Sequence, residues 1–371
     1  MNPQIIAFYL PQYHPIEENN KWYGKGFTEW TNVAQAKPLF KGHIQPRVPA
    51  DLGFYDLRIP EVREEQAKLA KEAGITAFCY YHYWFGNGKM LLEKPAEEML
   101  RSKQPDFPFC FCWANHSWLK KNWNAKTGIL DKTMLQEQLY PGVKDIKAHF
   151  DYLLPFFKDE RYYKIEGRPV FVLYVLNDIP DPIQLMNIWN DMAKQNGLPG
   201  IYFISYTGKI DDLHKEPFLH TDGIILSLLN TVAINNLSNK FDLYKYRIKR
   251  GISTFLKKPL LLYDYKEAIK CFLNPIAREE NVIPEIIPNW DYTPRQGAGN
   301  LILKNSTPSL FEQHANQALD LIKDKPKNKQ IIFLKSWNEW GEGNYMEPDI
   351  TWGRDYLKAL RNAINNHIES V

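Results

Sequence analysis

The sequence has no apolar run approaching the 18 consecutive residues that a membrane-spanning helix requires. Its first four residues, Met-Asn-Pro-Gln, lack the basic start and the apolar core of a secretory signal. From these two absences we expect a cytoplasmic protein without a transmembrane segment.

Cysteine and net charge are also scarce. The four cysteines form no CxxC pair, and Cys110 and Cys112 lie in an apolar run where buried thiols are expected. The formal net charge is only +3 over 371 residues. This charge is too small for a protein that holds nucleic acid through bulk charge, so no nucleic-acid partner is predicted.

Several catalytic motifs are missing. There is no GxSxG nucleophile motif, no GxxxxGK phosphate loop, no HExxH zinc motif and no Asp-x-Asp pair. His14, His82 and His116 could converge from successive strand ends, but none has a local ligand spacing such as HxH. We therefore expect no metal and no other cofactor.

Aromatic residues are abundant, at 14% of the chain with 11 Trp and 21 Tyr. They suit a large core, and their flat apolar faces also suit the walls of a sugar-binding cleft. Paired carboxylates are the chemistry that the sequence offers beside them.

Short apolar runs alternate with segments of helical period, which indicates parallel βα units. The predicted strands are Ile5–Tyr9, Ile75–Tyr81, Phe107–Trp113, Pro169–Val175, Ile201–Tyr206, Gly223–Leu228, Ile286–Trp290 and Ile331–Lys335. The predicted helices include Pro60–Ala73, Glu93–Ser102, Gly142–Phe157, Pro182–Asn196, Ser309–Lys323 and Gly353–Ile368. Eight such units predict an α/β protein, a (β/α)8 TIM barrel that forms one domain over residues 1–371. A doubly wound sheet is the alternative, but no Gly-rich turn follows the first strand.

One segment, at about residues 229–284, is too long for a simple crossover between strands six and seven. It contains the basic stretch KYRIKRGISTFLKK at residues 245–258. This stretch is either a contact for an anionic glycan or a membrane surface, or a solvated helix over the barrel mouth.

Barrel enzymes carry their chemistry at the carboxyl ends of the strands, and five of the eight predicted ends hold aromatic and polar clusters. Any one of these residues could serve packing, capping or surface pairing instead. Packing alone would not concentrate them at one end of the strands. The candidate substrate-binding residues are Tyr13, His14, Glu29, Trp30, Tyr80, His82, Trp84, Trp113, Asn115, Trp118, Trp290, Asp291, Asn338, Trp340, Tyr345 and Glu347.

The last predicted strand runs into SWNEWGEGNYMEPD, where Glu339 and Glu342 are three residues apart. Glycoside hydrolysis needs two carboxyl groups, one to donate a proton and one to act as nucleophile or base. Close pairing raises the pKa of one carboxyl, and Gly341 and Gly343 permit a tight turn around Glu342. A surface acidic loop is the alternative interpretation.

The same stretch resembles the signature of the WbsX family, which is similar to the endo-α-mannosidases of glycoside hydrolase family 99. The match continues, in order, through YLPQYHPIEENNKWYGKGFTEWTNV, GITAFCYYHYWF, FCFCWAN, GRPVFVLY and WDYTPR. It covers nearly the whole chain. One departure is WANHSW at residues 113–118, where the family pattern is closer to WANENW.

The resemblance implies a metal-independent, retaining glycoside hydrolase on a (β/α)8 barrel. Carried over, Glu339 is the base that takes the proton of the substrate's 2-hydroxyl, and Glu342 is the general acid and base. The intermediate is a 1,2-anhydro sugar, so the linkage must be 1,2-trans, as in α-mannosides and α-rhamnosides. The expected partner is a bacterial surface oligosaccharide or polysaccharide.

Two other functions remain open. Members of this family occur with surface-polysaccharide genes and have been labelled glycosyltransferases, so a transferase or transglycosylase of O-antigen or capsule biosynthesis, such as lipopolysaccharide biosynthesis, is the first alternative. A carbohydrate-binding protein without catalysis is the second, and it would not need both glutamates.

Overall fold

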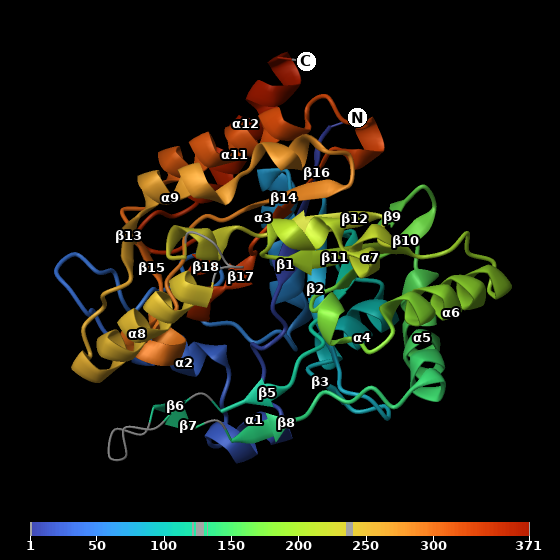
Figure 1. Cartoon of the computed structure of the whole chain (residues 1–371), viewed down its shortest axis with the longest axis horizontal. Coiled ribbons are helices and arrows are strands. Elements are labelled where there is room, and N and C mark those ends of the chain that lie inside the picture. The colour runs from blue at the N-terminus through green and yellow to red at the C-terminus, as the bar shows by residue number, and fades with distance from the viewer. Residues whose placement is uncertain (1, 121, 124–129, 132, 235–239, 371) are drawn as a thin grey trace.

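The computed structural model describes residues 2–120, 122–123, 130–131, 133–234 and 240–370 (Figure 1). Eight parallel strands form a closed barrel, because β1 pairs with β2 on one side and with β16 on the other. In barrel order the strands are β1 (Gln4–Tyr9), β2 (Ala77–Trp84), β4 (Phe109–Trp113), β10 (Arg168–Leu173), β11 (Tyr202–Thr207), β12 (Gly223–Leu226), β14 (Val282–Ile286) and β16 (Ile331–Leu334). The predicted (β/α)8 fold is confirmed.

The strands form where the sequence is continuously apolar, as expected for parallel strands buried on both faces. Ile5 of β1 pairs in register with Ile332 of β16, and both side chains are fully buried. Inside the barrel, Phe8 stacks on Tyr81 with ring centroids 5.4 Å apart and meets Phe333 at 5.1 Å. Aromatic rings therefore fill much of the lumen below the mouth.

Helices surround the barrel, and those predicted from apolar periodicity begin and end within two residues of the expected positions. The first of them, α3, starts with a proline in its first turn and ends at Gly74, whose φ of 88° suits glycine. The surrounding helices are α3 (Pro60–Ala73), α4 (Lys94–Ser102), α5 (Val143–Phe157), α6 (Pro182–Gln195), α7 (Glu216–Leu219), α11 (Pro308–Ile322) and α12 (Asp355–Ser370).

The seventh strand was predicted at Ile286–Trp290 and lies four residues earlier, at Val282–Ile286. Its register is fixed on both sides, with Ile224 opposite Val282 and Phe333 opposite Glu285. Two residues make β14 hard to recognise in the sequence, because Pro284 interrupts its apolar run and Glu285 is an acid inside the barrel. The correction places Trp290 in the loop that follows the strand.

The long connection between β12 and β14 contains structure of its own. Its described elements are η3 (Leu229–Val232), α8 (Lys240–Leu256), β13 (Leu262–Asp264), α9 (Tyr265–Phe272) and η4 (Pro275–Arg278). Strand β13 pairs in parallel with β15 (Ile302–Lys304), which belongs to the next βα loop. The connection and that loop thus form one unit, with a small apolar core of its own around Tyr265 and Leu301.

Further short elements lie in the loops after β1 and β14. Helices α1 (Glu17–Tyr23) and α2 (Glu29–Gln35) follow β1, and α10 (Thr293–Gln296) and η5 (Gly297–Gly299) follow β14. Figure 1 shows α2 and α8 on the same side of the barrel. No helix in the described ranges is long and apolar enough to cross a membrane.

Candidate active site

The loop after β16 folds into a small hairpin at the mouth of the barrel. Strand β17 (Asn338–Glu339) pairs with β18 (Asn344–Tyr345) across the 3-10 turn η7 (Trp340–Glu342). Gly343 ends the turn with a φ of 69°, and its α-carbon lies so close to the next loop that a Cβ would stand 2.8 Å from Asp291. The hairpin therefore presents Glu339 and Glu342 from two sides of one tight turn.

Two residues fasten the hairpin to the loop after β1. The side chain of Asn338 accepts a hydrogen bond from the Leu10 amide at 2.7 Å and donates one to the Leu10 carbonyl at 3.0 Å. The hydroxyl of Tyr13 donates to the Asn338 carbonyl at 2.5 Å and accepts from the Trp340 amide at 3.2 Å. All of these groups are buried, so the backbone on either side of Glu339 is held rigidly.

Behind the hairpin lies a third carboxyl group, Glu347. Trp340 Nε1 donates to it at 2.6 Å, Gln66 Nε2 at 2.6 Å and the Tyr55 hydroxyl at 2.9 Å. Burial raises the pKa of Glu347 to about 7 despite these donors. The hydrogen bond from Trp340 Nε1 to Glu347 fixes the ring of Trp340, which stacks on the ring of Tyr345 with centroids 3.7 Å apart.

The guanidinium of Arg295 contacts three carboxylates that come from two loops. Arg295 of α10 donates from Nε to Glu29 Oε1 at 2.8 Å, from Nη2 to Glu339 Oε2 at 2.7 Å and from Nη1 to Glu342 Oε1. A second close approach that requires glycine is here, because a Cβ on Gly341 would lie 1.9 Å from Glu29 Oε1 and 2.9 Å from Arg295 Nε. The loops after β1, β14 and β16 thus meet at Arg295.

The charges around Arg295 do not balance. Burial and the nearby charge of Glu342 raise the pKa of Glu339 to about 8, although Arg295 opposes the shift. Burial alone would lower the pKa of Arg295, but Glu29, Glu339 and Glu342 raise it well above its usual value. At neutral pH the protonated form of Glu339 is therefore favoured.

Both glutamates open onto a cavity of about 530 Å³ at the carboxyl ends of the strands. Its lining combines tyrosine and tryptophan rings with acids, amides and two cations. The lining includes Gln12, Tyr23, Phe27, Glu29, Asn32, Tyr81, Tyr83, His116, Trp118, Tyr174, Tyr292, Arg295, Gln296, Lys335, Glu339 and Glu342.

The floor of this cavity is polar. Lys335 Nζ donates to the Tyr206 hydroxyl at 2.8 Å and lies over the rings of Tyr174 and Tyr206. Below it, the buried Glu285 accepts from Ser227, and burial raises the pKa of Glu285 even though Lys335 opposes the shift. Lys335 is thus a second cation in the lining of the cavity, and its charge interacts with that of Glu342.

The sequence profile of the family described as "Glycosyltransferase WbsX" matches residues 5–360. The chain belongs to the WbsX family. An uncharacterized protein, WxcX, of Xanthomonas campestris pv. campestris is 34% identical over 362 residues, which are 97% of this chain and 49% of that protein. This WbsX chain therefore spans about half the length of the curated relatives that it matches.

Solved structures share the fold of this WbsX chain at low identity. The GH99 endo-alpha-mannosidase from Bacteroides thetaiotaomicron, in complex with BIS-TRIS-propane, has a TM-score of 0.59 and 14% identity, covering 99% of this chain and 98% of that one. A glycoside hydrolase-like protein has a TM-score of 0.60 and 15% identity, covering 98% and 94%. The predicted family and its GH99-like barrel are confirmed.

Four of the residues proposed from the sequence line the cavity of this WbsX chain: Glu29, Trp118, Glu339 and Glu342. A second group supports the hairpin, either as part of it (Asn338, Trp340 and Tyr345) or packed against it (Tyr13, Trp30 and Glu347). These positions divide the proposed residues into a layer that faces the cavity and a layer that holds it in shape.

Asp291 and Asn115 tie loops together. Asp291 accepts from His43 Nε2 at 2.7 Å and from Gln45 Nε2 at 2.6 Å. Although burial favours its protonated form, His43 and Arg47 lower the pKa of Asp291 to about 2. Asn115 donates to the Val175 carbonyl at 2.8 Å and accepts from the Val175 amide at 2.8 Å.

The remaining proposed residues lie away from the cavity. On β2, Tyr80, His82 and Trp84 point outward to the helix layer, where His82 Nε2 lies 2.8 Å from His149 Nε2 and Trp84 Nε1 donates to Asp145 at 3.0 Å. Trp113 also faces outward and donates to the Trp84 carbonyl. His14 is buried against the Pro11 carbonyl, and Trp290 stacks on Tyr292 beside the site.

Several lining residues were not in the set proposed from the sequence: Tyr81, Tyr83, Tyr174, Arg295 and Lys335. Strand alternation could have identified Tyr81 and Tyr83, because odd positions of β2 face the lumen when even positions face the helices. Arg295 ends the motif WDYTPR, but the motif does not indicate its contacts, because its partners Glu29 and Glu339 are 266 and 44 residues away.

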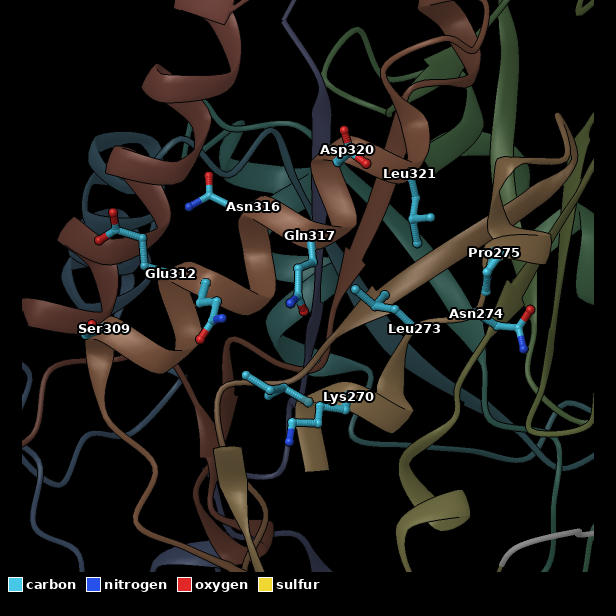
Figure 2. Close-up of a pocket in the computed structure, with 12 residues that line it drawn as sticks. Lys270, Leu273, Asn274, Pro275, Ser309, Glu312, Asn316, Gln317, Asp320 and Leu321 are labelled. Atoms are coloured by element: carbon cyan, nitrogen blue, oxygen red, sulfur yellow. The ribbon is translucent and has the colours of Figure 1, made fainter. Parts of the chain in front are cut away.

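A larger hollow, of about 910 Å³, lies on the outside of the barrel between α9 and α11 (Figure 2). Glu312, Asn316 and Asp320 line it from α11, and Lys270 lines it from α9. Its charges are paired locally, Lys270 with Glu267 and Asp320 with Lys323.

Among the described residues, no group of three or more His, Cys, Asp or Glu side chains is placed to hold a metal ion. The candidate active site is therefore the smaller cavity at the barrel mouth.

Proposed function

We propose that this chain is a retaining glycoside hydrolase that cleaves 1,2-trans linkages, α-manno- or α-rhamno-configured, in a bacterial surface or related polysaccharide. The observation that carries the proposal is the joint contact of Glu339 and Glu342 with Arg295 at the carboxyl end of a barrel. Two carboxyl groups, one protonated and one ionised, can supply an acid and a base to one glycosidic bond.

In the first step, Glu339 removes the proton of the 2-hydroxyl as O2 attacks the anomeric carbon. The bond from that carbon to the leaving oxygen breaks, and Glu342 gives the leaving oxygen its proton. The products are a 1,2-anhydro sugar and a free hydroxyl on the departing chain, so atoms and charges balance.

This step needs a proton on Glu342, whereas burial favours the protonated form of Glu339. A bound 2-hydroxyl that donates to Glu339 stabilises the anion of Glu339 and so favours the transfer of the proton to Glu342. Arg295 contacts both carboxylates and stabilises whichever one is ionised.

In the second step, Glu342 removes a proton from water as the water oxygen attacks the anomeric carbon and opens the anhydro ring. Glu339 returns its proton to O2. Two successive attacks on the same carbon retain its configuration. The carboxyl groups supply the acid and the base in both steps, so the proposal requires no metal.

The cavity walls support a carbohydrate substrate. Tyr81, Tyr83 and Trp118 present aromatic rings near the glutamates, and Glu29 and Asn32 add polar groups. Apolar ring faces can pack on the C–H faces of sugars, while carboxylates and amides accept or donate hydrogen bonds to hydroxyls.

The decisive experiment is incubation with α-mannose- and α-rhamnose-containing bacterial polysaccharides, followed by measurement of new reducing ends. We expect oligosaccharide release without a nucleotide donor, and an NMR time course in which the retained anomer appears first. Early appearance of the inverted anomer would rule out the anhydro-sugar route.

The family description favours one second candidate, a glycosyltransferase or transglycosylase. A parallel incubation with nucleotide sugars and an acceptor glycan distinguishes it. Consumption of the nucleotide sugar with no release of reducing ends would replace the hydrolase by the transferase. Product chains longer than the substrate, formed without nucleotide, would identify a transglycosylase.

A further inference from the structure

Helix α8 exposes an unusual number of large apolar side chains. Ile248 is 45% exposed, Ile252 is 46% exposed and Phe255 is 75% exposed, and Phe241 and Tyr244 are also exposed. These five residues recur at intervals of three or four, so they form one stripe along the helix. We call them the α8 stripe.

The opposite face of α8 is the one that packs on the protein. Ser253 is buried and its hydroxyl donates to the Ala298 carbonyl at 2.6 Å. Arg250 Nη2 donates to Gln296 Oε1 at 3.0 Å. These contacts fix the rotation of the helix about its axis. The α8 stripe therefore points away from the barrel and is exposed.

Positive charge lies along both edges of the stripe. Helical spacing puts Lys245 and Lys249 along one edge and Arg247 along the other. Residues 240–258 contain seven Lys or Arg residues and one acid, Asp242. An exposed apolar stripe between rows of cations is the pattern of a helix that lies in the surface of an anionic membrane.

We propose that the α8 stripe and its flanking cations dock this protein on a bilayer containing anionic lipids. The helix would lie in the plane of the interface, with Ile248, Ile252 and Phe255 among the acyl chains and the lysines at the phosphates. Charge argues against a second copy of this chain as the occupant, since two such stripes would bring two rows of cations together.

The position of α8 gives the docking a consequence. Gln296, which α8 contacts through Arg250, also lines the cavity that holds Glu339 and Glu342. A bilayer bound at α8 would therefore lie beside the mouth of the cavity. If the proposed hydrolase activity holds, which is a separate proposal, its substrate would be a glycan that is attached to or lies near that bilayer.

Sedimentation with lipid vesicles tests the docking without reference to activity. The purified chain is mixed with phosphatidylcholine vesicles that contain about one part in four of phosphatidylglycerol, or none. We expect it to sediment with the anionic vesicles, to bind them more weakly at high salt, and to stay in solution with phosphatidylcholine alone. Failure to sediment with the anionic vesicles at low salt would overturn the proposal.

Two variants separate the apolar contribution to vesicle binding from the electrostatic one. The stripe variant Ile248→Ser/Ile252→Ser/Phe255→Ser should lower the vesicle partition coefficient at least about tenfold through lost apolar burial. The charge variant Lys245→Gln/Lys249→Gln should lower it roughly fivefold per lysine. Serine and isoleucine have similar helix propensities, so α8 should persist, and circular dichroism checks this.

The matched control is Leu219→Ser/Ile350→Ser, which removes two equally exposed apolar side chains elsewhere, 60% and 69% exposed. It should sediment like the parent chain. Equal binding by the stripe variant and the parent would overturn the proposal. So would a concentration-dependent dimer in light scattering that the stripe variant abolishes while vesicle binding is unchanged.

Discussion

Arg295 Nη2 lies 2.7 Å from Glu339 Oε2, and this contact joins two loops that are 44 residues apart in the chain. The same guanidinium also contacts Glu29 and Glu342. Burial and the charge of Glu342 raise the pKa of Glu339 to about 8, even though this one cation faces all three carboxylates.

The first prediction concerns the two glutamates. Glu339→Gln and Glu342→Gln should each lower kcat at least about a hundredfold, because loss of a general acid or base removes that much rate. Both variants keep the size of the side chain, so their melting temperatures should stay near that of the parent. Glu312→Gln, in the outer hollow, is the control and should be fully active. Near-normal turnover in either active-site variant would contradict the mechanism.

Arg295 should control the protonation of the pair. Replacing it in Arg295→Met removes the cation that opposes protonation, so the pKa of Glu339 should move further up. The limb of the pH–rate profile that reports this group should move to higher pH, and kcat/KM should fall about a hundredfold or more. Arg295→Lys keeps the charge but cannot contact three carboxylates, and should recover the pH profile better than the rate.

Gly341 should tolerate no side chain. A Cβ in Gly341→Ala would meet Glu29 Oε1 at 1.9 Å and Arg295 Nε at 2.9 Å, so the ion pair between them must separate. We expect at least a tenfold loss of kcat/KM. The comparison is Gly251→Ala on α8, where no atom lies within 4 Å; it should keep full activity and stabilise the helix by about 0.5–1 kcal/mol in urea unfolding.

Glu339 and Glu347 should contribute less to stability as pH rises through the neutral range. The folded-state pKa values of Glu339 and Glu347 are raised, to about 8 and about 7, above those of the unfolded chain. Between roughly pH 4.5 and 7 these two groups therefore hold more protons in the folded protein than in the unfolded one, so raising the pH removes their contribution to stability. Each group contributes a slope of at most about 1.4 kcal/mol per pH unit. Urea unfolding of the parent chain and of Glu347→Gln at several pH values measures the contribution of Glu347, which is the difference between their slopes.

Two tryptophans should separate substrate binding from folding. Trp118 is half-buried and lines the cavity, so Trp118→Ala should raise KM severalfold with little change in melting temperature. Trp84 is 3% exposed and points to the helices, so Trp84→Ala should cost about 3–5 kcal/mol of unfolding free energy. If Trp84→Ala instead raised KM in a stable protein, the assignment of faces on β2 would be wrong.

Apolar periodicity was enough to predict the barrel and most of the surrounding helix ends, because both depend on local patterns of burial. It misplaced β14, since a barrel strand that contains Pro284 and Glu285 does not read as a core strand. In the long connection after β12, a solvated helix was one of two interpretations of residues 245–258, and α8 is a helix there. Periodicity did not decide between the two, because the apolar stripe of α8 faces outward, and the other elements of the connection were not predicted.

The candidate site was predictable only where it is local. Glu339 and Glu342 stand together in the sequence, and their loop follows a clear strand. Glu29 and Arg295 meet only after the barrel closes, and no one-dimensional pattern encodes that contact. On β2 the strand ends were identified, but the choice between Tyr83 and its neighbours depends on which positions face the lumen, and the register fixes that choice.

The hydrogen bond from Arg250 of α8 to Gln296 joins the outer surface to the residue next to Arg295. Through Arg295, the proton affinity of Glu339 depends on where that loop lies. Thermodynamic linkage then sets a reciprocal condition: any ligand of α8 that displaces the loop must change the protonation of the pair, and a change of protonation must alter the affinity of α8 for that ligand by the same factor.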